Sequence, residues 1–226
     1  LQFDVTITGL HKSKKNKLSG LDTDSTEIYL TLFKDKTVNE RLRSIYNKKA
    51  LQVIREQKAS LQQRSKIYEI GNNFYSLKDD INYKTSTNLL LDLSIKANDT
   101  FNIGMAYKNL GRYYIDNNQN DSSFYFYLKA EKICIKYKDS LNLGEIYVDK
   151  AFIQMYEADF NGSEISASKA LSFLGKAQNK LKIYDAYNLI GINSNQLRNY
   201  NRAIEYHNKA LNYLKENNLK NKYHLH

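Results

Sequence analysis

The sequence predicts an all-α protein, an α-solenoid in which antiparallel helix pairs stack into a right-handed superhelix. The prediction rests on a period of 40 residues that two separate series of small or apolar residues follow. The two series are Gly71, Gly111, Ala151 and Gly191, and Ala50, Leu90, Ala130, Ala170 and Ala210. Two series that share one period indicate an array of repeats. The 226 residues also include no proline, the strongest helix breaker, which suits a nearly all-helical chain.

The first residues differ from the rest of the chain. Phe3, Val5 and Ile7 alternate with polar residues, which is typical of a short strand or an extended arm. A lysine-rich segment follows and ends near Gly20, and it indicates a linker. Asp24 then offers a helix N-cap. We therefore expect an N-terminal arm or linker over residues 1–23 and a helical repeat domain over residues 24–226.

Each 40-residue unit divides into two helices of about 18 residues, because polar breaks recur at half the period. In the unit that follows Asp99, Ile103, Tyr107 and Leu110 recur at steps of three and four and share one helix face. Short polar connections force neighbouring helices to lie antiparallel. The expected units are about 24–58, 59–98, 99–138, 139–178 and 179–218.

The small residues of the two series predict close helix contacts. Glycine in the middle of a helix costs about 1 kcal/mol relative to alanine, so its recurrence suggests that the paired helix leaves no room for a side chain. Leu90 departs from its series of alanines, so we expect a looser or shifted contact there.

The formal net charge is +10, and it supports two interpretations. One is an acidic partner such as nucleic acid. The other is a composition rich in Lys, Asn and Ile that reflects an AT-rich genome. The lysines are spread over most predicted helices, whereas a nucleic-acid footprint clusters, so we keep a nucleic-acid-binding solenoid as the alternative function.

No catalytic, metal or cofactor motif is found in the sequence. A glycine-rich phosphate loop, a zinc-binding His-Glu-x-x-His helix and a Cys-x-x-Cys pair are all absent. Cys134 is the only cysteine, so no internal disulfide can form, and we interpret it as a packed thiol. We interpret His207 as a core residue of a second helix. We expect no enzyme activity and no cofactor.

The sequence leaves the compartment open between cytoplasm and periplasm. No apolar run reaches the length of a membrane span. The chain begins at Leu1 and shows no signal-peptide pattern, so we interpret it as a soluble fragment or processed form.

The clearest repeat is Tyr107-x2-Leu110-Gly111-x2-Tyr114, followed by Ser123-x3-Tyr127-x2-Ala130. This pattern resembles the signature of tetratricopeptide repeats, and the resemblance covers about residues 60–217. The period of 40 exceeds the usual 34 residues and the terminal proline of the family is absent, as in long-repeat variants of bacterial regulators. Lys150 occupies a position that is normally apolar.

The resemblance implies a non-catalytic module that binds a protein or peptide in a concave groove lined by the first helix of each unit. It further implies the sensor or scaffold part of a bacterial signalling or transcription regulator, and it leaves a homodimer open. The groove residues that it implies are Tyr68, Asn72, Tyr75, Lys108, Asn109, Arg112, Ile115, Glu145, Asp149, Phe152, Met155, Asp185, Asn188, Ile192 and Asn195.

The charges of this set are expected to orient the partner. Lys108 and Arg112 form a basic band, and Glu145 and Asp149 form an acidic one. One subgroup of the family clamps a terminal carboxylate with basic residues. Glu145 and Asp149 occupy repeat positions at which that clamp requires basic residues, so we exclude a full carboxylate clamp.

Overall fold

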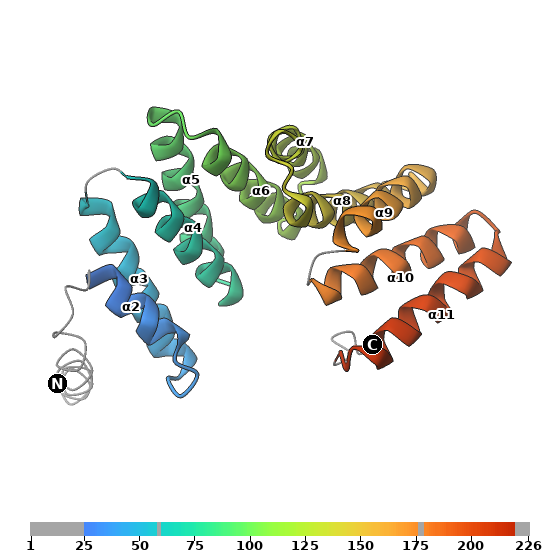
Figure 1. The fold of residues 1–226 in the computed structure, drawn as a ribbon, viewed down its shortest axis with the longest axis horizontal. Helices are drawn as coiled ribbons and strands as arrows, with labels where there is room; N and C mark the ends of the chain where they lie inside the picture. Colours follow the sequence, from blue (N-terminus) through green and yellow to red (C-terminus); the bar gives the residue numbers. More distant parts are fainter. Residues whose placement is uncertain (1–24, 58–59, 176–178, 220–226) are drawn as a thin grey trace. The chain divides into compact units, whose positions relative to one another are not determined.

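The computed structural model describes residues 25–57, 60–175 and 179–219, which form helices joined by short turns (Figure 1). The chain divides into two compact units between Asn98 and Asp99, and each unit is described by itself. The predicted arm over residues 1–23 lies outside the described residues. No strand occurs in the part of the chain that the structure describes, and the predicted all-α, solenoid class is confirmed.

The helices of each unit pack on their neighbours in sequence. The first unit contains α2 (Ser25–Lys34), α3 (Glu40–Glu56), α4 (Leu61–Ser76) and α5 (Asp80–Lys96). The second unit contains α6 (Thr100–Asp116), α7 (Asn120–Tyr137), α8 (Ser140–Tyr156), α9 (Phe160–Leu174), α10 (Lys180–Gln196) and α11 (Tyr200–Glu216). Within each unit, successive helices run antiparallel, and the even-numbered helices are the first helices of the predicted repeats.

One three-residue turn recurs between the helices. At the junction of α4 and α5, the Lys78 N–H donates to the carbonyl of Tyr75 and the Asp79 N–H donates to that of Phe74, both at 3.0 Å. These two bonds define a Schellman motif, which needs a left-handed residue after the helix. Asp79 then caps α5 by accepting the Asn82 N–H at 3.2 Å. One residue thus closes one helix and caps the next.

Left-handed residues recur at multiples of 20 residues in the described chain, just after the ends of α4 to α8, α10 and α11. They are Lys78, Asn98, Asn118, Lys138, Ala158, Arg198 and Asn218. The sequence-predicted breaks are confirmed at these junctions, but the motif itself was not predicted, because Lys, Ala and Arg are not left-handed signals.

Replacing Ala158 by glycine should raise the free energy of unfolding by about 1 kcal/mol. Ala158 has a φ of 60°, a conformation that costs residues with a Cβ about 1–2 kcal/mol and glycine almost nothing. Urea unfolding measures the difference. The matched control is Ala97→Gly, since Ala97 lies one position earlier in its turn with a φ of −92°. An equal effect of the two substitutions would contradict the turn assignment.

The small residues lie where helices approach most closely, as predicted. Ala130 is fully buried, and a Cβ added to Gly111 would lie 2.8 Å from the ring of Tyr127. Leu90 is buried as completely as the alanines of its series. The looser or shifted helix contact expected at Leu90 stays a prediction. His207 is not a core residue. Its ring covers Gly191, but the side chain is exposed because α11 has no described helix beyond it.

Candidate functional site

The first helices of the second unit, α6, α8 and α10, lie side by side and carry most of the predicted groove residues. Residues 40 apart occupy equivalent positions on these helices. Arg112, Phe152 and Ile192 therefore form one row across the three helices. Ile115 and Met155 belong to a second row, one turn closer to the C-terminal ends. We call these helices' shared surface the first-helix face.

The N-terminal half of the first-helix face is linked by buried polar contacts between repeats. Lys108 on α6 donates to the Asn142 side chain on α8 at 2.5 Å and forms an ion pair with Glu145. The Arg112 guanidinium lies 3.6 Å from the same carboxylate. Asn179, the cap of α10, donates to the other Glu145 oxygen at 2.6 Å. Glu145 thus connects all three first helices.

A second buried ion pair joins α8 to α10. Lys182 Nζ lies 2.5 Å from Asp149 Oδ1, and the Tyr127 hydroxyl on α7 donates to Asp149 Oδ2 at 2.8 Å. Asp149 is 7% exposed. Both of its oxygens are therefore occupied within the protein, so this carboxylate is already bound by a cation and a hydroxyl.

The environment lowers the pKa of both acidic residues. Burial by itself raises the pKa of Glu145, but Lys108, Arg112 and Asn179 outweigh it and lower the value. Burial likewise opposes ionisation of Asp149, and Lys182, Arg112 and Tyr127 outweigh it. Both groups are therefore carboxylates at neutral pH, and both stabilise the folded chain in that form.

Acid should weaken the fold through these two groups. Their pKa values are lower in the folded chain than the unfolded values of about 3.9 for Asp and 4.3 for Glu, so the unfolded chain binds more protons in acid. Their contribution is complete above those unfolded values and is lost as pH falls through the folded ones. The free energy of unfolding from urea titrations should therefore decline below about pH 5. The Glu145→Gln, Asp149→Asn double variant should decline less steeply, and equal slopes would contradict this account.

The charged residues of the two predicted bands are therefore paired within the protein. Lys108 and Asn109 are 3% and 1% exposed, and the charges of Lys108, Arg112, Glu145 and Asp149 meet one another between repeats. The sequence reading treated each helix separately, so it placed these charges in an open groove. Their binding of a partner stays a prediction.

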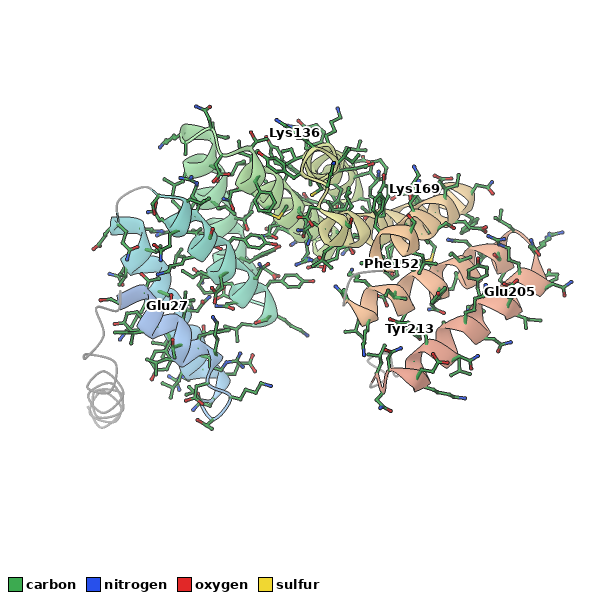
Figure 2. The ribbon with its side chains drawn as sticks, viewed as in Figure 1. Glu27, Lys136, Phe152, Lys169, Glu205 and Tyr213 are labelled. Carbon is green, nitrogen blue, oxygen red and sulfur yellow. The ribbon has the colours of Figure 1, made fainter. Side chains whose placement is uncertain are left out.

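Apolar and amide side chains on the C-terminal half of the first-helix face remain partly exposed. Phe152, labelled in Figure 2, Met155 and Ile192 are half-buried. Asn188, in the middle of α10, is also half-buried, and its Oδ1 lies 3.1 Å from His207 Nδ1. In the first unit, Tyr68 and Asn72 are half-buried, and Tyr75 is exposed and packs on Tyr83 with ring centroids 5.2 Å apart. These side chains keep solvent-exposed surface that a partner could cover.

Lys150, the departure from the family pattern, is accommodated between α7 and α8. Its Nζ donates to Glu131 Oε2 at 2.6 Å and lies 5.0 and 5.2 Å from the ring centroids of Phe124 and Tyr147. The Tyr147 hydroxyl donates to the other Glu131 oxygen at 2.5 Å. A charged residue at an apolar repeat position is thus satisfied by a carboxylate and two aromatic faces.

The described residues contain no cluster of three or more His, Cys, Asp and Glu side chains that could hold a metal ion. Cys134 is buried, and burial raises the pKa of its thiol to about 12, so it stays protonated at neutral pH. Among the described helices, none is long and apolar enough to cross a bilayer.

Open clefts on the surface are a product of the repeat. A cleft of about 900 Å³ in the first unit is lined by Ile45 and Leu77, among others, between α3 and the α4–α5 turn. A cleft of about 580 Å³ in the second unit is lined by Ile165 and Leu197, which lie 120 residues later at equivalent positions. Because the same cleft recurs after three repeats, it is not a site built for one ligand.

Comparisons with known proteins support the fold. No protein-family model and no curated protein sequence matches the chain. Among solved structures, BtubC (BKLC) from P. vanneervenii superposes with a TM-score of 0.71 at 12% identity, covering 97% of this chain and 88% of that one. Aspartyl phosphate phosphatase F from Bacillus subtilis gives 0.65 at 12% identity, covering 92% and 65%.

A third similar structure is a signal transduction ATPase with numerous domains and a tetratricopeptide repeat sensor, from Pyrococcus horikoshii. It gives a TM-score of 0.61 at 16% identity and covers 94% of this chain. The chain spans about a third of that protein, 35%, and slightly less than two thirds of the phosphatase. Identities this low carry the fold alone, and that fold is of the tetratricopeptide-repeat type.

Proposed function

We propose that this tetratricopeptide-like solenoid is a non-catalytic module that binds a protein or peptide through the first-helix face of its second unit. The observation that carries the proposal is the division of that face. Its N-terminal half is closed by ion pairs, whereas its C-terminal half presents half-buried Phe152, Met155 and Ile192. Partly exposed aromatic and methionine side chains are the kind that dominate binding energy at interfaces.

The ion pairs support this function by fixing the surface in advance. Glu145 and Asp149 join the three first helices, so Phe152 and Ile192 are held in one row before a partner arrives. A surface that is already ordered loses less conformational entropy on binding. The affinity would come from the apolar side chains of Phe152 and Ile192.

We further propose that the module is the sensor or scaffold part of a bacterial signalling or transcription regulator. The support is the long repeat and the similarity to a multidomain signal-transduction ATPase whose repeat region is a sensor. In such an arrangement, partner binding on the first-helix face would be the input to other domains.

The experiment is quantitative affinity enrichment with the immobilised chain. Partners of the parent should be lost from a Phe152→Ser, Ile192→Ser variant that keeps the helical circular dichroism of the parent. The matched control is Ile165→Ser, which removes an apolar side chain that is 59% exposed on α9. If the double variant and the control retain the same partners, the first-helix face is not the binding surface.

The alternative, a nucleic-acid-binding solenoid, is tested in the same experiment. The structure does not favour it, because Lys108, Lys150 and Lys182 each pair with a carboxylate. A nucleic-acid binder would retain DNA or RNA with an affinity that falls steeply with salt, whatever the residues at 152 and 192.

A further inference from the structure

The outward side of α7 carries an apolar stripe. Tyr125, Leu128, Lys132 and Ile135 recur at steps of three and four, so they lie on one face of the helix. Tyr125 is 53% exposed, Leu128 41% and Ile135 55%. We call this surface, residues 125, 128, 132 and 135 with the lysines beside them, the α7 outer face.

Lysines surround the apolar stripe. Lys129, Lys132 and Lys136 lie on the same helix, and Figure 2 labels Lys136 beside α7. Lys129 Nζ lies 4.4 Å from the ring centroid of Tyr125, which holds its charge next to the stripe. The acidic residues of α7 are Asp121 in the first turn and Glu131, whose oxygens are bound by Tyr147 and Lys150. The α7 outer face therefore combines the apolar side chains of Tyr125, Leu128 and Ile135 with Lys132 inside the stripe and Lys129 and Lys136 at its rim.

The repeat shows that the fold does not require this surface. Equivalent positions on three other second helices, α5, α9 and α11, are also exposed. They are Thr85, Asn88, Asp92 and Ile95 on α5, Ile165, Ser168, Ser172 and Gly175 on α9, and Glu205, Asn208, Asn212 and Lys215 on α11. Only α7, among these four helices, combines three large apolar side chains with lysines. Large apolar side chains that gather on one exposed helix face are a feature of interaction sites.

We propose that the α7 outer face docks an amphipathic helix of a partner protein, whose apolar stripe is flanked by Asp and Glu. The stripe from residue 125 to 135 runs for about 15 Å along a straight helix, which matches roughly three turns of a partner helix packed against it. The lysine rim requires acidic flanks. A second copy of this chain does not fit, because it would bring lysine against lysine in a protein of net charge +10.

This surface is separate from the first-helix face. The side of α7 that packs on other helices is marked by the buried residues Tyr127, Ala130 and Cys134, which alternate in position with the exposed stripe. The proposal therefore gives the module a second binding surface and does not depend on the groove.

The test uses the full chain and two synthetic helical peptides labelled with fluorescein. The first carries Leu at steps of three and four with Glu on both flanks, and the second has Lys in place of Glu. Fluorescence anisotropy should show binding of the acidic peptide only, with an affinity that falls as salt rises from about 50 to about 300 mM. A Leu128→Asn, Ile135→Thr variant should bind at least about tenfold more weakly. Ile165→Ser on α9 should bind like the parent.

Charge reversal provides an independent arm, because it leaves Tyr125, Leu128 and Ile135 in place. A Lys132→Glu, Lys136→Glu variant should lose the acidic peptide and gain the basic one. The Phe152→Ser, Ile192→Ser variant should bind the acidic peptide unchanged, so a failure of this proposal is distinguishable from a failure of the first-helix face.

Four results would overturn the proposal. The first is equal binding of both peptides, and the second is unchanged binding by the Leu128→Asn, Ile135→Thr variant. The third is loss of the peptide from the Phe152→Ser, Ile192→Ser variant, which would move the peptide to the groove. The fourth is binding of phosphatidylserine vesicles or single-stranded DNA through Lys132 and Lys136 without binding of the acidic peptide.

Discussion

Replacing Asp149 by alanine is expected to lower the free energy of unfolding by about 3 kcal/mol. Removing one partner of a buried ion pair leaves the other charge without compensation, which costs about 3–5 kcal/mol. We expect a cost at the lower end of this range, because the Lys182 side chain is 22% exposed and can reach water. The Tyr127 hydroxyl also loses its acceptor.

Urea unfolding of Asp149→Ala, Lys182→Met and the double variant measures the effect as a double-mutant cycle. The double variant should be more stable than Asp149→Ala, since it no longer carries an unpaired lysine between α8 and α10. Glu205→Ala removes a solvent-exposed ion pair with Lys209 and should change little. Additive single effects at 149 and 182 would show that the two residues do not interact.

Enlarging Gly111 to leucine is expected to lower the free energy of unfolding by about 1–3 kcal/mol, because the packed core has no space for the side chain. A Cβ at this position would already lie 2.8 Å from the Tyr127 ring, which is fully buried. Tyr127 cannot move away without giving up its hydrogen bond to Asp149. Ala130→Leu, at a position that is also fully buried, should act in the same direction.

Gly191→Leu is the matched control for this prediction. The ring of His207 covers Gly191 as Tyr127 covers Gly111, but His207 is exposed and can turn into solvent. The loss at Gly191 should therefore be smaller than at Gly111. Thermal melts in which Gly111→Leu and Ala130→Leu match the parent would refute the close contacts inferred from the two residue series.

The repeat could be predicted from the sequence because packing constrains residue size. Gly111, Ala130 and their equivalents must be small wherever helices touch, so they recur at one period and are visible without a structure. The helix breaks were visible for a similar reason, since Asp and Asn cap the helices that follow them. The left-handed conformation of Lys78 and Ala158 could not be predicted from the sequence. A Schellman turn requires a left-handed backbone at this position but accepts residues other than glycine there.

The candidate site was only partly predictable. The resemblance placed Lys108 and Glu145 on one face, but their pairing depends on how closely α6 and α8 approach, which no local pattern records. The available signal was their separation of 37 residues, one period less one helical turn, which places the glutamate one turn closer to the N-terminal end of the neighbouring first helix, within reach of the long lysine side chain. The same rule connects Asp149 to Lys182, 33 residues later and two turns short of a period.

Hydrogen exchange of the chain, with and without a partner recovered by affinity enrichment, tests the central claim most directly. If the first-helix face binds the partner, amide exchange should slow in the C-terminal halves of α8 and α10, around Phe152 and Ile192, while the exposed side of α9 around Ile165 exchanges as before. Protection confined to α9 and α11, or no protection on α8 and α10, would contradict the account.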